Sequence, residues 1–293
     1  MSASVSTAAV RPTAIGSGKT AKQRLLLTTA LLLCLLTSAV MLFPLFWMFS
    51  SSLKTRAEIF LNPPVWLPHS LQWVNFKLLF TEHNFGRVLY NSFFVAILYT
   101  GLSLFFNSIA GFAFAKYEFR GQKLLFMIVL GSMMVPAETA MVPLFIIYRN
   151  LGLVDSLWGV ILPGVASAFG IFFMRQYCSG IHNELLEASR VDGCSEIGLF
   201  VRVVLPNLKP AFASLGIVTF VGQWNNFLWP SVILRSASNQ TISLAIRALE
   251  SGNRTPYELI MSGSVISVIP LLLIIFLFQK QLISGLMEGS VKG

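Results

Sequence analysis

The segment "HNELLEASRVDGCSEIG", residues 182–198, carries five charged side chains within thirteen positions. The chain around it is very different, because 55% of the 293 residues are hydrophobic, only 11% are charged and the mean hydropathy is +0.73. Soluble domains contain about 25% charged residues, so this composition excludes a soluble protein. Long uncharged apolar runs predict transmembrane helices, and the short alternating strands of a membrane barrel are not seen. We therefore predict an all-α membrane protein in which the charged segment lies outside the bilayer.

Six apolar stretches are long enough to cross a membrane as helices. They cover residues 25–49, 88–114, 124–147, 156–174, 211–233 and 259–279. With a cytoplasmic N-terminus, 13 of the 21 Lys and Arg residues fall on the cytoplasmic side, which is the side that basic residues prefer. We predict cytoplasmic N- and C-termini, a disordered cytoplasmic tail over residues 1–24 and a membrane domain over residues 25–293. The first stretch is too long for the apolar core of a signal peptide.

The charged segment belongs to a long cytoplasmic connection, about residues 175–210, between the fourth and fifth predicted spans. Its pattern predicts two short helices. Leu185, Ala188 and Val191 form an apolar stripe on the first helix, which Asp192-Gly193 should end. Ser195 can cap the second helix, and its apolar stripe comprises Ile197, Phe200, Val203 and Val204. A helix pair of this size must pack on the membrane helices or dock into a partner, and periodicity favours neither.

Two predicted spans contain polar residues. Pro136 and Glu138 interrupt the third span, so either the helix ends near Pro136 with Glu138 at the outer mouth, or the break lines a pathway. The fifth span contains Gln223, Trp224, Asn225 and Asn226. Amides inside a span bond across helices or line a route for a polar solute, and the sequence leaves both interpretations open.

Several kinds of site are disfavoured. The stretch "GSGKT", residues 16–20, resembles half of a nucleotide-binding loop, but it lacks the earlier glycine and a preceding strand. The three cysteines and three histidines show no spacing typical of a metal site, so we predict none. Because no chain of ionisable residues runs through the spans, an ion-coupled secondary transporter has weak support, and an intramembrane enzyme has less.

The residues "EASRVDG" followed by "LP" resemble the EAA loop of permease subunits of ATP-binding-cassette (ABC) importers. Glu187, Ala188, Gly193, Leu205 and Pro206 match that pattern, and Ser189 stands in place of an alanine. The stretches "PLFWMFSSSLKTRAEIF", "AFAKYEFRGQKLLF", "MMVPAETAMVPLFIIYRNLGLVDS" and "GQWNNFLWP" also resemble carbohydrate importer permeases. The type most similar is the smaller six-span subunit of the maltose-importer kind. Asn226 departs from it, because many members carry an acid there.

The resemblance implies the type I ABC importer permease fold, in a bacterial or archaeal cytoplasmic membrane. It implies that the loop docks into a separate ATPase subunit and that the chain itself is not an enzyme and binds no cofactor, since ATP and Mg²⁺ belong to the ATPase. The expected partners are a second permease subunit, an ATPase dimer and an extracytoplasmic solute-binding protein. The expected ATPase-coupling residues are Glu187, Ala188, Ser189, Asp192, Gly193, Leu205 and Pro206.

The resemblance also implies a solute pathway for a sugar, with a polyol phosphate such as glycerol phosphate as the alternative. Its expected residues are Trp224, Asn225, Asn226 and Glu138. The outer loop "LESGNRTPYE", residues 249–258, resembles a segment that approaches the binding protein, with contacts expected from Gly252, Asn253 and Arg254. The alternative interpretation of this loop is an ordinary solvated connector.

Overall fold

The computed structural model describes residues 21–251 and 255–288, with side chains for residues 25–250 and 255–279. The first twenty residues of the predicted tail lie outside the described residues. Within the described ranges the chain is helical and contains no strand, which confirms the all-α prediction. The chain divides into two compact units, residues 1–47 and residues 48–293.

The described part of the first unit belongs to helix α1 (Ala21–Ser52). Its apolar window has no buried residue. The threonine hydroxyls in this helix bond back to carbonyls three or four residues earlier, for example Thr29 Oγ1 to Leu25 O at 2.9 Å and Thr37 Oγ1 to Leu33 O at 2.9 Å. These bonds matter because hydrocarbon offers a hydroxyl no other partner.

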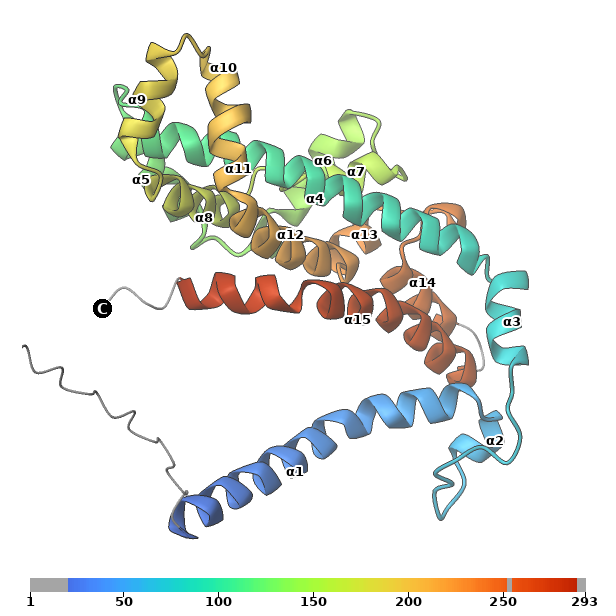
Figure 1. Cartoon of the computed structure of the whole chain (residues 1–293). Coiled ribbons are helices and arrows are strands. Elements are labelled where there is room, and N and C mark those ends of the chain that lie inside the picture. The colour runs from blue at the N-terminus through green and yellow to red at the C-terminus, as the bar shows by residue number, and fades with distance from the viewer. Residues whose placement is uncertain (1–20, 252–254, 289–293) are drawn as a thin grey trace, which may run out of the picture. The chain divides into compact units, whose positions relative to one another are not determined.

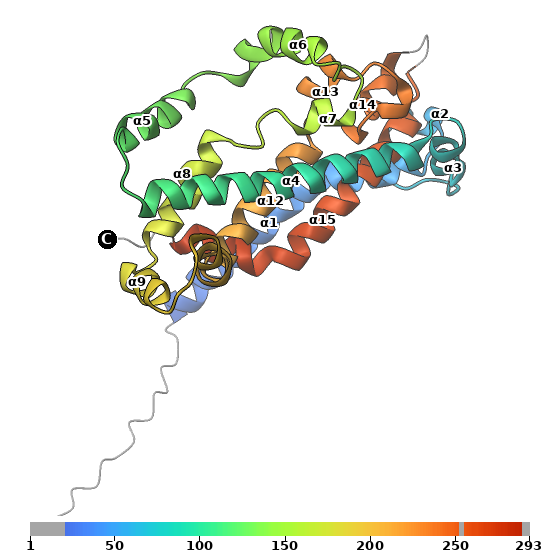
Figure 2. The same ribbon diagram turned by 90° about the horizontal axis from the view of Figure 1, so that it is seen from above.

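Among the described residues, three helices are long and apolar enough to cross a membrane: Leu25–Ser52 within α1, α4 (Phe85–Lys116), and Tyr257–Gln279 within α15 (Tyr257–Glu288). Two helix pairs pass the same test only together, because each is bent at a short break. The first pair is α5 (Gln122–Ser132) with η1 (Ala137–Ala140) and α6 (Met141–Asn150), bent by 94°. Figure 2 shows α5 and α6 as separate helices. The second pair is Glu196–Asn207 with α12 (Lys209–Trp224), bent by 77°.

The stretch 156–174, which the pattern predicts as one span, is not a single helix. It is divided into α7 (Leu157–Ile161) and α8 (Ala168–Ser179). Between them Pro163 is followed by Gly164 at φ +82°, a left-handed conformation that glycine adopts easily. Ser167 then caps α8 by accepting a hydrogen bond from Gly170 N at 3.0 Å. The all-α membrane fold is as predicted. Because this stretch is not one continuous helix, the count of six spans stays a prediction.

The predicted fifth span is broken as well. Helix α12 ends at Trp224, and α13 (Leu228–Ile233) starts after three residues without helix. The remaining short helices are α2 (Arg56–Ile59), α3 (Val74–Thr81), α9 (Asn183–Val191), α10 (Glu196–Leu199), η2 (Phe200–Val204), α11 (Leu205–Asn207), η3 (Ala237–Asn239), α14 (Ile242–Ala248) and η4 (Leu249–Ser251).

Helix α4 is the central element of the second unit and packs against α8, α12 and α14 (Figure 1). Its contact with α8 is closest at two glycines. A Cβ on Gly111 would lie 2.6 Å from Met174 Cβ, and a Cβ on Gly170 would lie 2.4 Å from Asn107 Nδ2. Small residues allow membrane helices to approach this closely. The buried Asn107 holds the pair further, because its Oδ1 accepts from Ser167 N at 3.0 Å.

Candidate functional site

We call residues 183–207 the charged hairpin. It comprises α9, α10, η2 and α11, and Figure 1 shows α9 and α10 extending beyond the ends of α8 and α12. Gly193 turns the chain between its two arms with φ +79°. Ser195 Oγ accepts from Gly198 N at 3.2 Å and so caps α10. The predicted end of the first helix and the predicted cap of the second are both confirmed.

The charged hairpin is anchored by three buried side chains, Leu186, Leu199 and Val204. They pack in one cluster with Met174 and Cys178 of α8. The predicted stripe of Leu185, Ala188 and Val191 is exposed instead, and Val191 is 89% exposed. Leu186 lies about 160° around the helix from the centre of that stripe, at 100° per residue. The hairpin therefore packs on the membrane helices through one face and leaves its predicted stripe open for a partner.

The end of α4 holds both arms of the charged hairpin. Lys116 Nζ donates to Ile181 O and, at 2.8 Å, to Asn183 Oδ1 at the start of α9. The Tyr117 hydroxyl donates to Glu196, the first residue of α10. Arg190 Nε also binds Glu196, at 2.8 Å, which connects α9 to α10. The Arg190 guanidinium, assisted by the Tyr117 hydroxyl, lowers the pKa of the Glu196 carboxyl from 4.5 to about 2.

The expected coupling residues all lie on the charged hairpin. Glu187, Ala188, Asp192 and Gly193 are exposed at its outer end. Ser189 is half-buried, and its hydroxyl donates to Leu185 O at 2.8 Å. Leu205, half-buried, and Pro206, exposed, begin α11 at the opposite end of the second arm. Their contact with an ATPase stays a prediction.

A second feature is a pocket of about 390 Å³ in the second unit. Three interruptions of helix contribute to its wall: Ala137–Ala140, the Pro163-Gly164 turn, and the segment from Gln223 to Leu228 that contains the α12–α13 break. Irregular backbone at membrane depth is tolerated where it lines a cavity, because the unpaired backbone groups can be satisfied there. All three broken stretches therefore meet at one place.

The polar groups of the pocket come from Tyr99, Glu138, Gln223 and Asn226. The Tyr99 hydroxyl donates to Gly164 O at 3.0 Å, and Asn226 Nδ2 donates to Gln223 Oε1 at 3.3 Å. Gln223 Nε2 is covered but has no hydrogen-bond partner within the described part of the chain. The pocket lining thus contains the side-chain amides of Gln223 and Asn226 and the exposed carboxylate of Glu138, which is an acceptor. Glu138 and Asn226, two of the expected pathway residues, both line this pocket, and passage of a solute through it stays a prediction.

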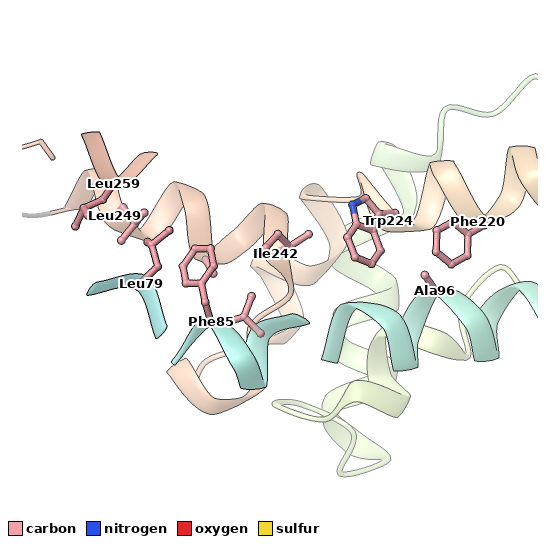
Figure 3. Packing of buried hydrophobic residues seen from close by; sticks show 10 residues of the cluster. Leu79, Phe85, Ala96, Phe220, Trp224, Ile242, Leu249 and Leu259 are labelled. Atoms are coloured by element: carbon pink, nitrogen blue, oxygen red, sulfur yellow. The ribbon is translucent and has the colours of Figure 1, made fainter. Parts of the chain in front are cut away.

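The other two expected pathway residues lie elsewhere. Trp224 is 1% exposed and packs between Phe93 and Phe220, with ring centroids 4.7 and 5.8 Å away. Figure 3 shows it in the core that faces α4. Its indole nitrogen donates to Ser267 O at 3.1 Å. Asn225 is exposed, ends α12 and is not part of the pocket lining. Gly252, Asn253 and Arg254 lie outside the described residues.

Sequence reasoning missed Tyr99 and Gln223 as pocket residues, and Lys116 and Tyr117 as contacts of the hairpin. Tyr99 sits in an uninterrupted apolar helix, so no local pattern distinguishes it from a lipid-facing tyrosine. Gln223 is one amide among several in its stretch, and only the fold separates it from its neighbour Trp224. A local signal for the hairpin contacts Lys116 and Tyr117 is the run "AKYEFRG", because it places a lysine and a tyrosine directly after a predicted span.

Comparison with known proteins agrees with this architecture. The family described as "Binding-protein-dependent transport system inner membrane component" matches residues 103–287. The arabinooligosaccharides transport system permease protein AraQ of Bacillus subtilis is 39% identical over 263 residues, which cover 88% of this chain and 93% of AraQ. The lactose transport system permease protein LacG of Rhizobium radiobacter is 31% identical and covers 88% of this chain and 93% of its own. The sn-glycerol-3-phosphate transport system permease protein UgpE of Yersinia enterocolitica is 30% identical, with 86% and 92% covered.

A solved structure has the same fold. The crystal structure of a bacterial ABC transporter involved in the import of the acidic polysaccharide alginate matches with a TM-score of 0.78 and 24% identity, covering 89% of this chain and 97% of the matched chain. The family match extends over more than half of the sequence, and the curated relatives match over nearly the whole of it. The chain belongs to the family of binding-protein-dependent transport system inner membrane components.

Proposed function

We propose that this chain is the smaller permease subunit of an ABC importer and forms half of the translocation pathway for a sugar. One observation carries the proposal: a single pocket built from three helix breaks occurs in the same unit as a charged hairpin that exposes its outer end. The first feature suits passage of a polar solute, and the second suits docking of a driving subunit. The sugar relatives AraQ and LacG support the choice of solute.

In this proposal the chain hydrolyses nothing itself. ATP and Mg²⁺ bind to a separate ATPase dimer, which contacts the hairpin at Glu187, Ala188, Ser189, Asp192 and Gly193, with Leu205 and Pro206 fixing the second arm. The outer partner is a solute-binding protein that reaches Gly252, Asn253 and Arg254, and a second permease subunit completes the pathway. The hairpin and both termini lie in the cytoplasm. The ATPase drives transport because it favours one conformation of the permease when nucleotide is bound.

The pocket favours an uncharged solute over a polyol phosphate. Among its lining residues the carboxylate of Glu138 is the one charge, and Lys, Arg and His are absent from that lining. Recognition of phosphate relies on Arg and Lys, and a carboxylate repels an anion. An amide donor and a carboxylate acceptor are instead suited to sugar hydroxyls. We therefore infer a neutral oligosaccharide, with Glu138, Gln223, Asn226 and Tyr99 as its polar contacts in this subunit.

The test is uptake by proteoliposomes that contain this chain with its second permease subunit, its ATPase and its binding protein. We expect ATP-dependent uptake of a labelled arabinooligosaccharide or lactose, and no uptake when the ATPase is omitted. Solute flux through this chain alone would contradict the proposal and favour a secondary transporter. Uptake of glycerol phosphate but of neither sugar would contradict the choice of solute while leaving the importer intact.

A further inference from the structure

The loop between α2 and α3, residues 60–73, contains no Asp, Glu, Lys or Arg, yet it leaves large apolar side chains in the open. We call it the α2–α3 loop. The exposed fractions are 58% for Trp66, 67% for Leu67, 58% for Leu71 and 63% for Trp73. Large apolar side chains exposed together in one short loop mark a surface that another phase or molecule covers.

Hydrogen bonds to residues 53–58 hold the backbone of the α2–α3 loop. The fully buried Lys54 donates from Nζ to Val65 O at 2.6 Å, and Gln72 N donates to Leu53 O at 3.0 Å. His69 N donates to Glu58 Oε1 at 3.1 Å. Several backbone groups of the loop are therefore already bonded to the protein, and these stay satisfied when its outer face lies in an apolar environment.

The position of the α2–α3 loop relative to the spans identifies what covers it. The apolar span of α1 ends at Ser52, and that of α15 begins at Tyr257. Ser262 Oγ donates to Ser52 O at 3.0 Å, so these two span ends lie together. The ring of Phe60 packs edge-on against that of Tyr257, with centroids 5.0 Å apart. The loop thus lies where two membrane spans finish, which is the boundary between hydrocarbon and headgroups.

We propose that the α2–α3 loop is an interfacial membrane anchor, whose Trp66, Leu67, Leu71 and Trp73 side chains lie among the lipid headgroups. Tryptophan is enriched at this level of the bilayer because its ring is apolar and its N–H is polar. The loop has no Asp, Glu, Lys or Arg side chain to desolvate, and its backbone is held at Val65, His69 and Gln72, which lowers the cost of contact with lipid. The anchor sets the depth at which the outer ends of α1 and α15 sit.

The test uses the assembled importer in phosphatidylcholine nanodiscs, with Cys34, Cys178 and Cys194 replaced and uptake verified. A fluorescent label is placed at Leu67→Cys or at Leu71→Cys. The matched control is Lys77→Cys, an exposed position on the neighbouring α3. We expect headgroup-level nitroxide lipids to quench both loop labels at least about twofold more than the control, and aqueous iodide to show the opposite order.

Two results would overturn the proposal. Loop labels that iodide quenches as strongly as the control would place the loop in water. Loop labels shielded from both quenchers would show that a protein partner covers it. A second measurement avoids the label: brominated lipids should quench the intrinsic fluorescence of the wild-type importer more than that of the Trp66→Phe/Trp73→Phe variant, and equal quenching would contradict the anchor.

Discussion

Gly193 has the most demanding backbone conformation in the charged hairpin. At φ +79° a residue with a side chain is strained by about 1–2 kcal/mol, and proline, fixed near −65°, cannot adopt this conformation at all. We expect Gly193→Pro to abolish ATP-driven uptake while membrane insertion persists. Gly193→Asn is the control, because asparagine tolerates the left-handed region and a Cβ here meets open space. Proteoliposome uptake measures both, and normal transport by Gly193→Pro would rule out the proposed coupling role.

Glu58 provides a pH-dependent restraint on the α2–α3 loop. Its carboxylate accepts from Thr55 N at 2.9 Å and from His69 N at 3.1 Å, and these bonds, with the His69 ring, lower its pKa from 4.5 to about 2. A lowered pKa stabilises the folded state fully above pH 4.5, and the effect is lost as the pH falls through about 2. Thermal unfolding of the purified complex should therefore become less pH-dependent between these values in Glu58→Gln. If Glu58→Gln leaves the pH dependence of the unfolding temperature unchanged, this carboxylate does not contribute to the stability of the folded state.

Where the role of a residue depends only on its neighbours in the chain, the sequence predicts that role. The end of α9 at Asp192-Gly193 and the Ser195 cap follow from local backbone chemistry, and both are observed. The burial of Leu186 in place of the predicted stripe was not predictable. It depends on Met174 and Cys178, which lie on a different helix, and a nine-residue helix carries too few apolar positions to identify one face.

At the scale of helices, the contact between α4 and α8 depends on Gly111. A Cβ there would lie 2.6 Å from Met174 Cβ and 2.7 Å from the backbone nitrogen of Arg175, so one of the helices must move. We expect Gly111→Ala to destabilise the subunit by about 1–3 kcal/mol through overpacking. Gly101→Ala on the same helix is the control, because its Cβ meets nothing within 4 Å. Thermal stability of the purified complex should fall for the first variant and not for the second, and equal effects would contradict the packing explanation.

The connection from α4 to the charged hairpin makes a separate prediction. Tyr117→Phe removes the hydroxyl that donates to Glu196 but leaves the Arg190–Glu196 ion pair intact. A hydrogen bond of this kind contributes about 1 kcal/mol, so we expect the solute transported per ATP hydrolysed to fall several-fold. Tyr90→Phe, at an exposed position of α4, should leave the ratio unchanged. If the two variants transport equal amounts of solute per ATP hydrolysed, the contact between Tyr117 and Glu196 does not transmit the conformational change.

The elements themselves were predictable only where a helix is continuous. The stretch 88–114 corresponds closely to α4, since nothing interrupts its apolar run. The stretches 124–147, 156–174 and 211–233 are equally apolar, but Pro136, the Pro163-Gly164 turn and the break at residues 225–227 divide them. Hydropathy measures the environment of a segment and not its backbone, so it does not distinguish a broken span from a straight one.

For the molecule as a whole, the charge of the pocket should govern which solutes pass. Glu138 supplies its one carboxylate, and Lys and Arg are absent from its lining. We expect Glu138→Lys to weaken uptake of a neutral sugar and to increase inhibition by an anionic competitor such as glycerol phosphate. Glu138→Gln is the control, since it keeps the size and removes the charge. Identical competition profiles for wild type and Glu138→Lys would exclude a role for this pocket in selection.

The pocket could be predicted from the sequence only in part. The sequence predicts Glu138 and Asn226 as candidates because polar residues are conspicuous within apolar stretches. Trp224, next to them in sequence, instead lies in the core beside Phe220 (Figure 3). The helix ends at Trp224, and this ending sends neighbouring side chains to opposite surroundings. Such a division depends on tertiary packing, which the local sequence pattern does not reveal.

The close approach of α4 to α8 at Gly111 has a mechanical consequence. If α4 tilts as a rigid rod about that contact, its two arms are unequal: Lys116 lies about 7.5 Å and Tyr99 about 18 Å from the pivot, at 1.5 Å per residue. A displacement of the hairpin end would then appear at the pocket in the opposite direction and enlarged about 2.4-fold. Under this rigid-rod motion, a small displacement at Lys116 would move Tyr99, which lines the pocket, by a larger distance and so change the shape of the pocket.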